Sequence, residues 1–176
     1  MGMMKKIISF FIVVFFFGLL ITLVSLIMPS KVISARTVMI NASLRDITTQ
    51  AFDLASWKNW NPAFQLADSI IISGPVNGKG AKAVWFKNKR QNILTVIAVS
   101  DSAIRFNIDR KGENTIVNDI YVHSFEGRSD LEVEWRSIHS LKWYPWDKFA
   151  GMFIDKATGP GYDAALKQLK ELTENQ

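Results

Sequence analysis

Three polar side chains at alternate positions, Asp119, Tyr121 and His123, are the residues of this chain with the clearest potential for chemistry. On one β-strand their side chains would point to the same face of the sheet, because the side-chain period of a strand is two. A carboxylate, a phenol and an imidazole on the wall of an apolar cavity can orient a ligand or move a proton. The competing interpretation is an exposed or hydrogen-bonded strand face. These residues define the enzyme hypothesis.

Other chemistries have little support in the sequence. The chain has no cysteine, which excludes disulfides and thiolate catalysis, and His139 and His123 lack a carboxylate at the spacing of a zinc site. We expect no metal and no cofactor, and we expect His139 on the surface. Glu134 and Arg136 should form a solvated ion pair. The segment GKGAK (78–82) lacks the Ser/Thr and the helix of a phosphate loop, and no Arg/Lys stripe indicates a nucleic-acid groove.

Two pairs of tryptophans flank turn signals. Trp57 and Trp60 lie in SWKNWNP (56–62), and Trp143 and Trp146 enclose Tyr-Pro. Asn-Pro favours turn initiation, so the first pair should lie in a connector. Either pair could fill a corner between elements or cover the mouth of a cavity.

Periodicity predicts the elements that position these residues. A strand over 31–41 is followed by a helix that Ser43 caps, with Asp46 at its third position, and that runs to the first tryptophan pair. Short connections then imply antiparallel hairpins. The predicted strands are 68–74, 81–87, 92–99, 103–109, 115–125 and 130–140, with Ile104, Phe106, Ile108, Leu131, Val133 and Trp135 facing an interior.

The last part of the chain predicts a long helix. Its apolar stripe should face the sheet and comprises Trp146, Phe149, Met152, Phe153, Ala157, Tyr162, Ala165, Leu166, Leu169 and Leu172. Gly159-Pro160-Gly161 should bend or break the helix. An antiparallel sheet with helices against one face is an α+β arrangement.

The strongest signal is the uncharged run over residues 7–28. About 20 apolar residues span a bilayer, whereas the apolar core of a cleaved signal peptide has only ~7–15. We therefore predict an uncleaved membrane anchor over 1–29 and a separate domain over 30–176. Lys5 and Lys6 favour a cytoplasmic N-terminus and an extracytoplasmic domain on the inner membrane, although basic residues after the span nearly balance them.

A group of basic residues lies in and around one predicted hairpin: Lys79, Lys82, Lys87, Lys89 and Arg90. A tethered domain could place such a group against anionic headgroups. A solvated hairpin is the simpler interpretation.

Three segments, in this order, resemble the START-like superfamily of polyketide cyclases and lipid-transfer domains, often abbreviated SRPBCC, and more narrowly its membrane-anchored bacterial members. They are VMINASLRDITTQAFDLASWKNWNP, GKGAKAVWFKN and MFIDKATGPGYDAALKQLKEL. The likeness begins before them, at MKK and the apolar run that follows, and covers nearly the whole chain. It implies a helix-grip fold, in which a curved antiparallel sheet surrounds the long C-terminal helix and leaves a cavity. It implies a site for an apolar or amphipathic molecule and no particular reaction.

On this basis we expect a membrane-tethered domain that binds a lipid-like or isoprenoid-like molecule. The residues expected to contact it are Trp57, Trp60, Trp85, Phe106, Tyr121, His123, Trp135, Phe149 and Phe153. The first alternative is a cyclase- or dehydratase-type enzyme that uses Asp119, Tyr121 and His123. The second is a non-catalytic interaction module whose core the six tryptophans fill. The sequence indicates membrane and small-molecule partners, no nucleic acid, and no particular oligomeric state.

Overall fold

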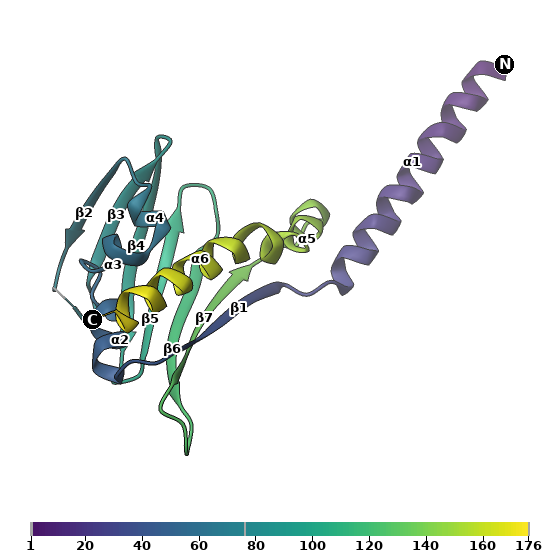
Figure 1. The fold of residues 1–176 in the computed structure, drawn as a ribbon. Helices are drawn as coiled ribbons and strands as arrows, with labels where there is room; N and C mark the ends of the chain where they lie inside the picture. The colour runs from purple at the N-terminus through teal and green to yellow at the C-terminus, as the bar shows by residue number, and fades with distance from the viewer. Residues whose placement is uncertain (1, 76, 176) are drawn as a thin grey trace.

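A computed structural model describes residues 2–75 and 77–175, and its centre is a seven-stranded antiparallel sheet of order β1-β7-β6-β5-β4-β3-β2 (Figure 1). The strands are β1 (Lys31–Ile40), β2 (Ser69–Ser73), β3 (Lys82–Lys87), β4 (Arg90–Val99), β5 (Ala103–Arg110), β6 (Ile116–Ser124) and β7 (Leu131–Ser140). The helices are α1 (Gly2–Ile27), α2 (Leu44–Phe52), α3 (Trp57–Trp60), α4 (Pro62–Gln65), α5 (Pro145–Gly151) and α6 (Ile154–Glu174). The helix-grip fold is confirmed, with α6 across one face of the sheet.

Alternation along the strands decides which face meets α6. Ile104, Phe106 and Trp135 are buried and lie on this inner face, as predicted. A register shift between Val96 and Ala98 adds a bulge, which bends and twists a strand. β1 pairs with the last strand, with Lys31 opposite Ser140, so the start of the domain lies beside the end of β7.

The helix after β1 is shorter than predicted. The Ser43 hydroxyl accepts a hydrogen bond from the Asp46 amide at 3.1 Å, which confirms the cap. α2 ends at Phe52, however, and Trp57–Trp60 forms its own short helix. The Asp53 carboxylate accepts the Ala55 amide at 2.9 Å and turns the chain there, because a local side-chain bond offers the backbone an alternative to helix.

The C-terminal helix continues through Pro160, so the chain does not leave the helix at 159–161. The interruption lies earlier, at Met152 and Phe153, between α5 and α6. Gly159 instead leaves room for the side chain of Arg36 on β1, because a Cβ at residue 159 would overlap the guanidinium. Arg36 crosses the helix at this glycine and pairs with Asp155 at 3.0 Å and Asp163 at 3.3 Å, one turn to either side.

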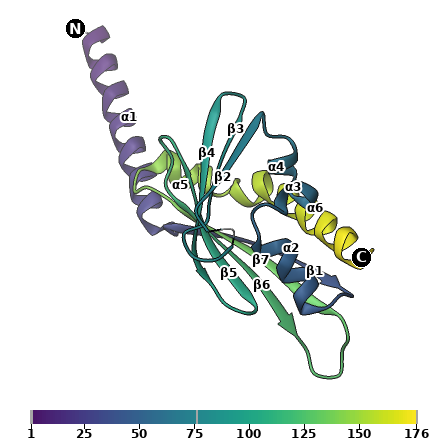
Figure 2. The same cartoon turned by 90° about the vertical axis from the view of Figure 1, so that its left-hand side faces the viewer.

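α1 projects away from the domain, and among the described residues it is the one helix long and apolar enough to cross a membrane (Figure 2). A membrane anchor and a signal sequence share these properties. Its last turn contacts α5. This places the apolar segment against the start of the C-terminal helical region and away from the core of the sheet.

Candidate ligand-binding cavity

A cavity of about 310 Å³ lies between the inner face of the sheet, the short helix α4 and the middle of α6. Its apolar wall comprises Trp57, Phe64, Trp85, Ile108 and Trp135, with Tyr162 and Ala165 from α6. These residues come from six elements: the short helices α3 and α4, the strands β3, β5 and β7, and the helix α6.

Trp57 is the centre of an aromatic cluster behind this wall. Its ring centroid lies 5.2 Å from those of Trp60 and Phe106 and 5.8 Å from that of Trp135. The indole N–H groups of Trp57 and Trp60 donate to the carbonyls of Ala51 and Gln50 at 2.9 and 3.0 Å. Buried tryptophans normally find such partners. Both tryptophans are therefore corner-packing residues, and Trp57 also lines the cavity.

A short hydrogen-bonded chain leads away from the cavity wall at Tyr162. The Tyr162 hydroxyl donates to Ser137 Oγ at 3.0 Å, and Ser137 Oγ lies 3.0 Å from His139 Nε2. The prediction that His139 lies on the surface is wrong, since strand parity places it with Trp135 and Ser137 on the inner face. It borders a second cavity of about 180 Å³ near the β5–β6 turn.

Burial decides the charge of this chain. It lowers the pKa of His139 below its ordinary value, and the positive charge of Arg110 acts in the same direction. Burial raises the pKa of Tyr162. Both side chains are therefore neutral near pH 7.

Two cations stand at the rim of the cavity, Lys87 at the end of β3 and Arg110 at the end of β5. Arg110 Nε donates to the side-chain oxygen of Asn92 at 2.8 Å, and Asn92 is buried. This bond orients the guanidinium, and Arg110 Nη1 also lies 3.5 Å from a Glu113 carboxylate oxygen. The cavity therefore offers an apolar interior and an entrance with two basic side chains, of which Arg110 is paired with a carboxylate.

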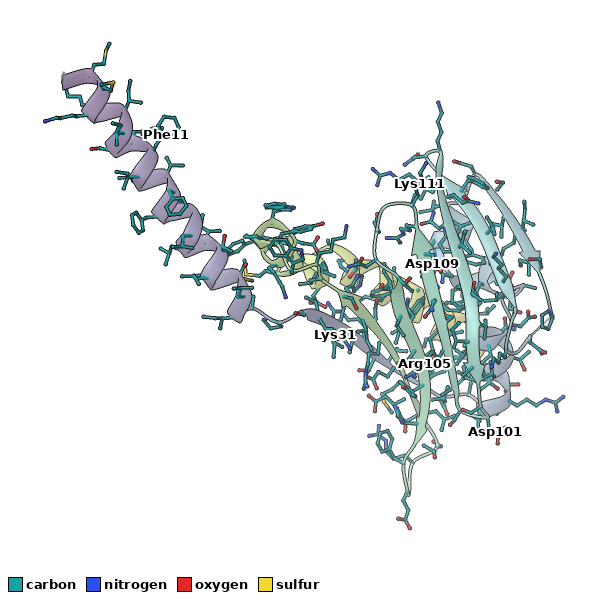
Figure 3. The ribbon with its side chains drawn as sticks, turned by 180° about the vertical axis from the view of Figure 1, so that it is seen from behind. Phe11, Lys31, Asp101, Arg105, Asp109 and Lys111 are labelled. Atoms are coloured by element: carbon teal, nitrogen blue, oxygen red, sulfur yellow. The ribbon has the colours of Figure 1, made fainter. Side chains whose placement is uncertain are left out.

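Asp119, Tyr121 and His123 lie on the opposite face of the sheet, so the expected contacts of Tyr121 and His123 with the cavity are wrong, and the alternative of a hydrogen-bonded or exposed strand face describes all three. Their neighbours Ile120 and Val122 are buried on the inner face. Asp119 instead accepts a 2.6 Å hydrogen bond from Arg105, which Figure 3 shows on the face away from α6. His123 Nε2 lies 3.5 Å from a Glu134 carboxylate oxygen on that same outer face.

The expected position of the α5 aromatics is also wrong. Phe149, Met152 and Phe153 do not face the concave sheet. The helix is interrupted between α5 and α6, and α5 packs against the end of α1. Phe153 and Met152 are largely exposed, and so are Trp143 and Trp146, which excludes corner packing for the second tryptophan pair.

Of the nine predicted contact residues, Trp57, Trp85 and Trp135 line the cavity, and the buried Trp60 and Phe106 pack behind its wall. Sequence reasoning missed Arg110 and Tyr162 as cavity residues. Tyr162 carried a signal, its place on the apolar stripe of the last helix, whereas Arg110 had none. Within residues 2–75 and 77–175, no group of three or more metal-ligating side chains is assembled.

No family model matches the sequence, and no curated protein matches it. Solved structures do match. Truncated norcoclaurine synthase from Thalictrum flavum superposes with a TM-score of 0.63 at 15% identity, over 83% of this chain and 95% of that one. The di-domain ARO/CYC StfQ from the steffimycin biosynthetic pathway gives 0.66 at 10% identity, over 82% of this chain and 51% of StfQ. Hypothetical protein jhp0584 from Helicobacter pylori gives 0.61 at 10% identity, over 81% and 88%.

The chain has the START-like helix-grip fold. At these identities the likeness establishes the fold alone.

Proposed function

We propose that this START-like domain binds a small amphipathic molecule with an anionic group. The observation that carries the proposal is the apolar cavity with Arg110 oriented by Asn92 at its rim. Pockets that enclose small ligands are mostly apolar and contain a few placed polar groups. The volume of about 310 Å³ lies at the lower end of the usual range of ~300–1,000 Å³, which suits a ring system or a short chain.

The proposal extends the membrane tether predicted from the sequence. We propose that α1 is an uncleaved anchor in the inner membrane, with Lys5 and Lys6 in the cytoplasm and the domain outside. An anchored domain would meet hydrophobic ligands at their source.

Binding is favoured over catalysis because the polar groups near the cavity are already engaged. Tyr162 donates to Ser137. Asp119, the carboxylate of the enzyme hypothesis, lies away from the cavity, where it accepts a hydrogen bond from Arg105 on the far side of the sheet. A general acid or base needs a free hydrogen-bonding path to the ligand.

The anionic naphthalene dye ANS tests the binding proposal. With the full-length protein in detergent, Arg110→Gln should weaken ANS binding about tenfold, equivalent to ~1.4 kcal/mol, because a charge-assisted hydrogen bond is lost. Arg128→Gln is the matched control, an exposed arginine paired with Asp130 in the turn at the opposite end of the sheet. Equal effects of the two substitutions, or no saturable binding by the parent, would contradict the proposal. Native mass spectrometry of the same sample would identify a co-purifying ligand.

The second candidate is a cyclase- or dehydratase-type reaction. The observation that favours it is the Tyr162–Ser137–His139 chain, which joins the cavity to the second cavity and could move a proton. Tyr162→Phe distinguishes the two functions once a ligand is known. A carrier should keep its affinity within about fivefold, because an uncharged hydrogen bond contributes only ~1 kcal/mol. An enzyme should lose turnover by ~10²–10⁴-fold.

A further inference from the structure

Large apolar side chains remain uncovered on and around α5. Trp143 and Trp146 are each 71% exposed, Met152 is 59% exposed and Phe153 is 63% exposed. They lie within eleven consecutive residues, 143–153. Contiguous exposed apolar surface of this kind normally marks an interaction site.

The position of α5 relative to α1 identifies what covers this surface. Lys148 of α5 is buried, 3% exposed, and its ammonium group donates to the carbonyls of Met28 and Pro29 at 3.2 and 3.1 Å and to Ser30 Oγ at 2.7 Å. These acceptors follow the last residue of α1 directly. Ser25 in the last turn of α1 is buried as well. α5 therefore lies beside the end of the apolar helix, as both Figure 1 and Figure 2 show.

We propose that α5 and its flanking aromatics, residues 143–153, lie in the interface of the bilayer that α1 spans and hold the domain against an anionic membrane surface. The inference rests on the anchoring of α1 proposed above. If α1 crosses the bilayer, α5 must lie at the depth where α1 leaves it. Tryptophan rings favour this depth, and amphipathic segments with apolar aromatics on one side bind there in the plane of the membrane.

The charge on the adjoining end of the sheet fits this surface. The register places Lys31 opposite Ser140, Arg110 opposite Asn92, and Lys87 opposite Arg90. These residues therefore lie at the same end of the sheet. Lys89 and Lys111 occupy turns at this same end. Figure 3 shows Lys111 at this end of the sheet and Asp101 at the opposite end. Basic residues at this end of the sheet can contact anionic headgroups.

The basic group predicted from the sequence is divided by this arrangement. Lys87, Lys89 and Arg90 lie at the same end of the sheet as Lys31 and Arg110, whereas Lys79 and Lys82 lie at the other end of β3. Lys87 and Arg110 also form the rim of the cavity. Docking through α5 would therefore turn the cationic rim toward the bilayer, and an amphipathic ligand would enter from the lipid.

Depth-resolved quenching tests the inference on the full-length chain, which contains no cysteine. Single cysteines at Val14→Cys in α1, Ala150→Cys in α5 and Asp101→Cys in the far turn would each carry an environment-sensitive fluorophore. The protein would be reconstituted in phosphatidylcholine vesicles with and without phosphatidylglycerol, and quenched by lipids with nitroxides at the headgroup or along the acyl chain. We expect acyl-chain quenching at Val14, headgroup-level quenching at Ala150 that increases with phosphatidylglycerol, and none at Asp101.

The three positions separate failure of the docking inference from failure of the anchor. Quenching at Val14 without quenching at Ala150 would overturn the docking and leave the anchor standing. Quenching at neither position would overturn both. Equal quenching at Ala150 and Asp101 would show non-specific adsorption and would also overturn the docking.

A substitution on the proposed surface provides the second readout. Trp146→Ser should reduce quenching at Ala150 toward the value at Asp101, without changing quenching at Val14. The matched control is Phe125→Ser, since Phe125 is also an exposed aromatic and lies in the turn after β6, away from α5. Unchanged quenching at Ala150 in Trp146→Ser would contradict a role for the aromatics.

Discussion

The burial of His139 should make the folded chain sensitive to acid. Its pKa is lowered in the folded state, whereas in the unfolded chain it should lie near the ordinary ~6.5. Between these two values the unfolded state binds more protons, so the free energy of unfolding falls as pH decreases from ~6.5 through the folded-state pKa. Urea unfolding at a series of pH values should show this loss.

His139→Gln removes the titration and should flatten the pH dependence in that window. The control is His123→Gln on the outer face, where the side chain is partly exposed and pairs with Glu134. It should leave the contribution of His139 in place. An unchanged slope in His139→Gln would show that another group causes the acid sensitivity.

At the scale of elements, the crossing of Arg36 over α6 depends on the absence of a side chain at residue 159. In Gly159→Ala the new Cβ overlaps the guanidinium, so Arg36 must move and its pairing with Asp155 is lost. We expect a destabilisation of ~1–3 kcal/mol, the usual cost of overpacking. Thermal and urea unfolding would measure it.

Gly161→Ala is the matched control in the same helix. A Cβ at this position meets no atom within 4 Å, so the substitution should stabilise the helix by ~0.5–1 kcal/mol. Opposite signs at the two positions support the close approach of α6 to β1. Equal effects would indicate that both substitutions act only through helix propensity and that the Cβ at residue 159 does not displace Arg36.

At the scale of the whole molecule, residues 30–176 should fold without α1. The buried apolar core extends from Ile40 to Leu169 and includes no side chain of α1. We expect soluble protein with cooperative thermal unfolding. Aggregation of this fragment alongside normal folding of the full-length chain would contradict two separable parts.

The cost of the truncation should be local to α5. Removal of residues 1–29 deletes two carbonyl acceptors of Lys148 and leaves a buried ammonium with the Ser30 hydroxyl. Amide hydrogen exchange in α5 should therefore become faster than in α6. A fragment that begins at Met28 restores both carbonyls and should restore protection, and its failure to do so would argue against this role of Lys148.

The sequence by itself determined the strands and the apolar helix. Hydrophobic alternation and turn residues predicted the β5 strand and the inward position of Phe106, because strand period and turn chemistry are properties of neighbouring residues. The Ser43 cap was visible for the same reason, and so was the uncharged run before Pro29.

Only the tertiary structure decided which face each polar residue shares. The inner face of β6 could not be recognised from its sequence, because the polar residue Asn118 lies on that face. Asn118 is buried there, and its side-chain oxygen accepts the indole N–H of Trp135 at 3.1 Å. Burial of Lys148 likewise depends on carbonyls some 120 residues earlier in the chain. A local pattern specifies an element, but the face it buries and the charges it meets depend on partners that are distant in sequence and adjacent only after folding.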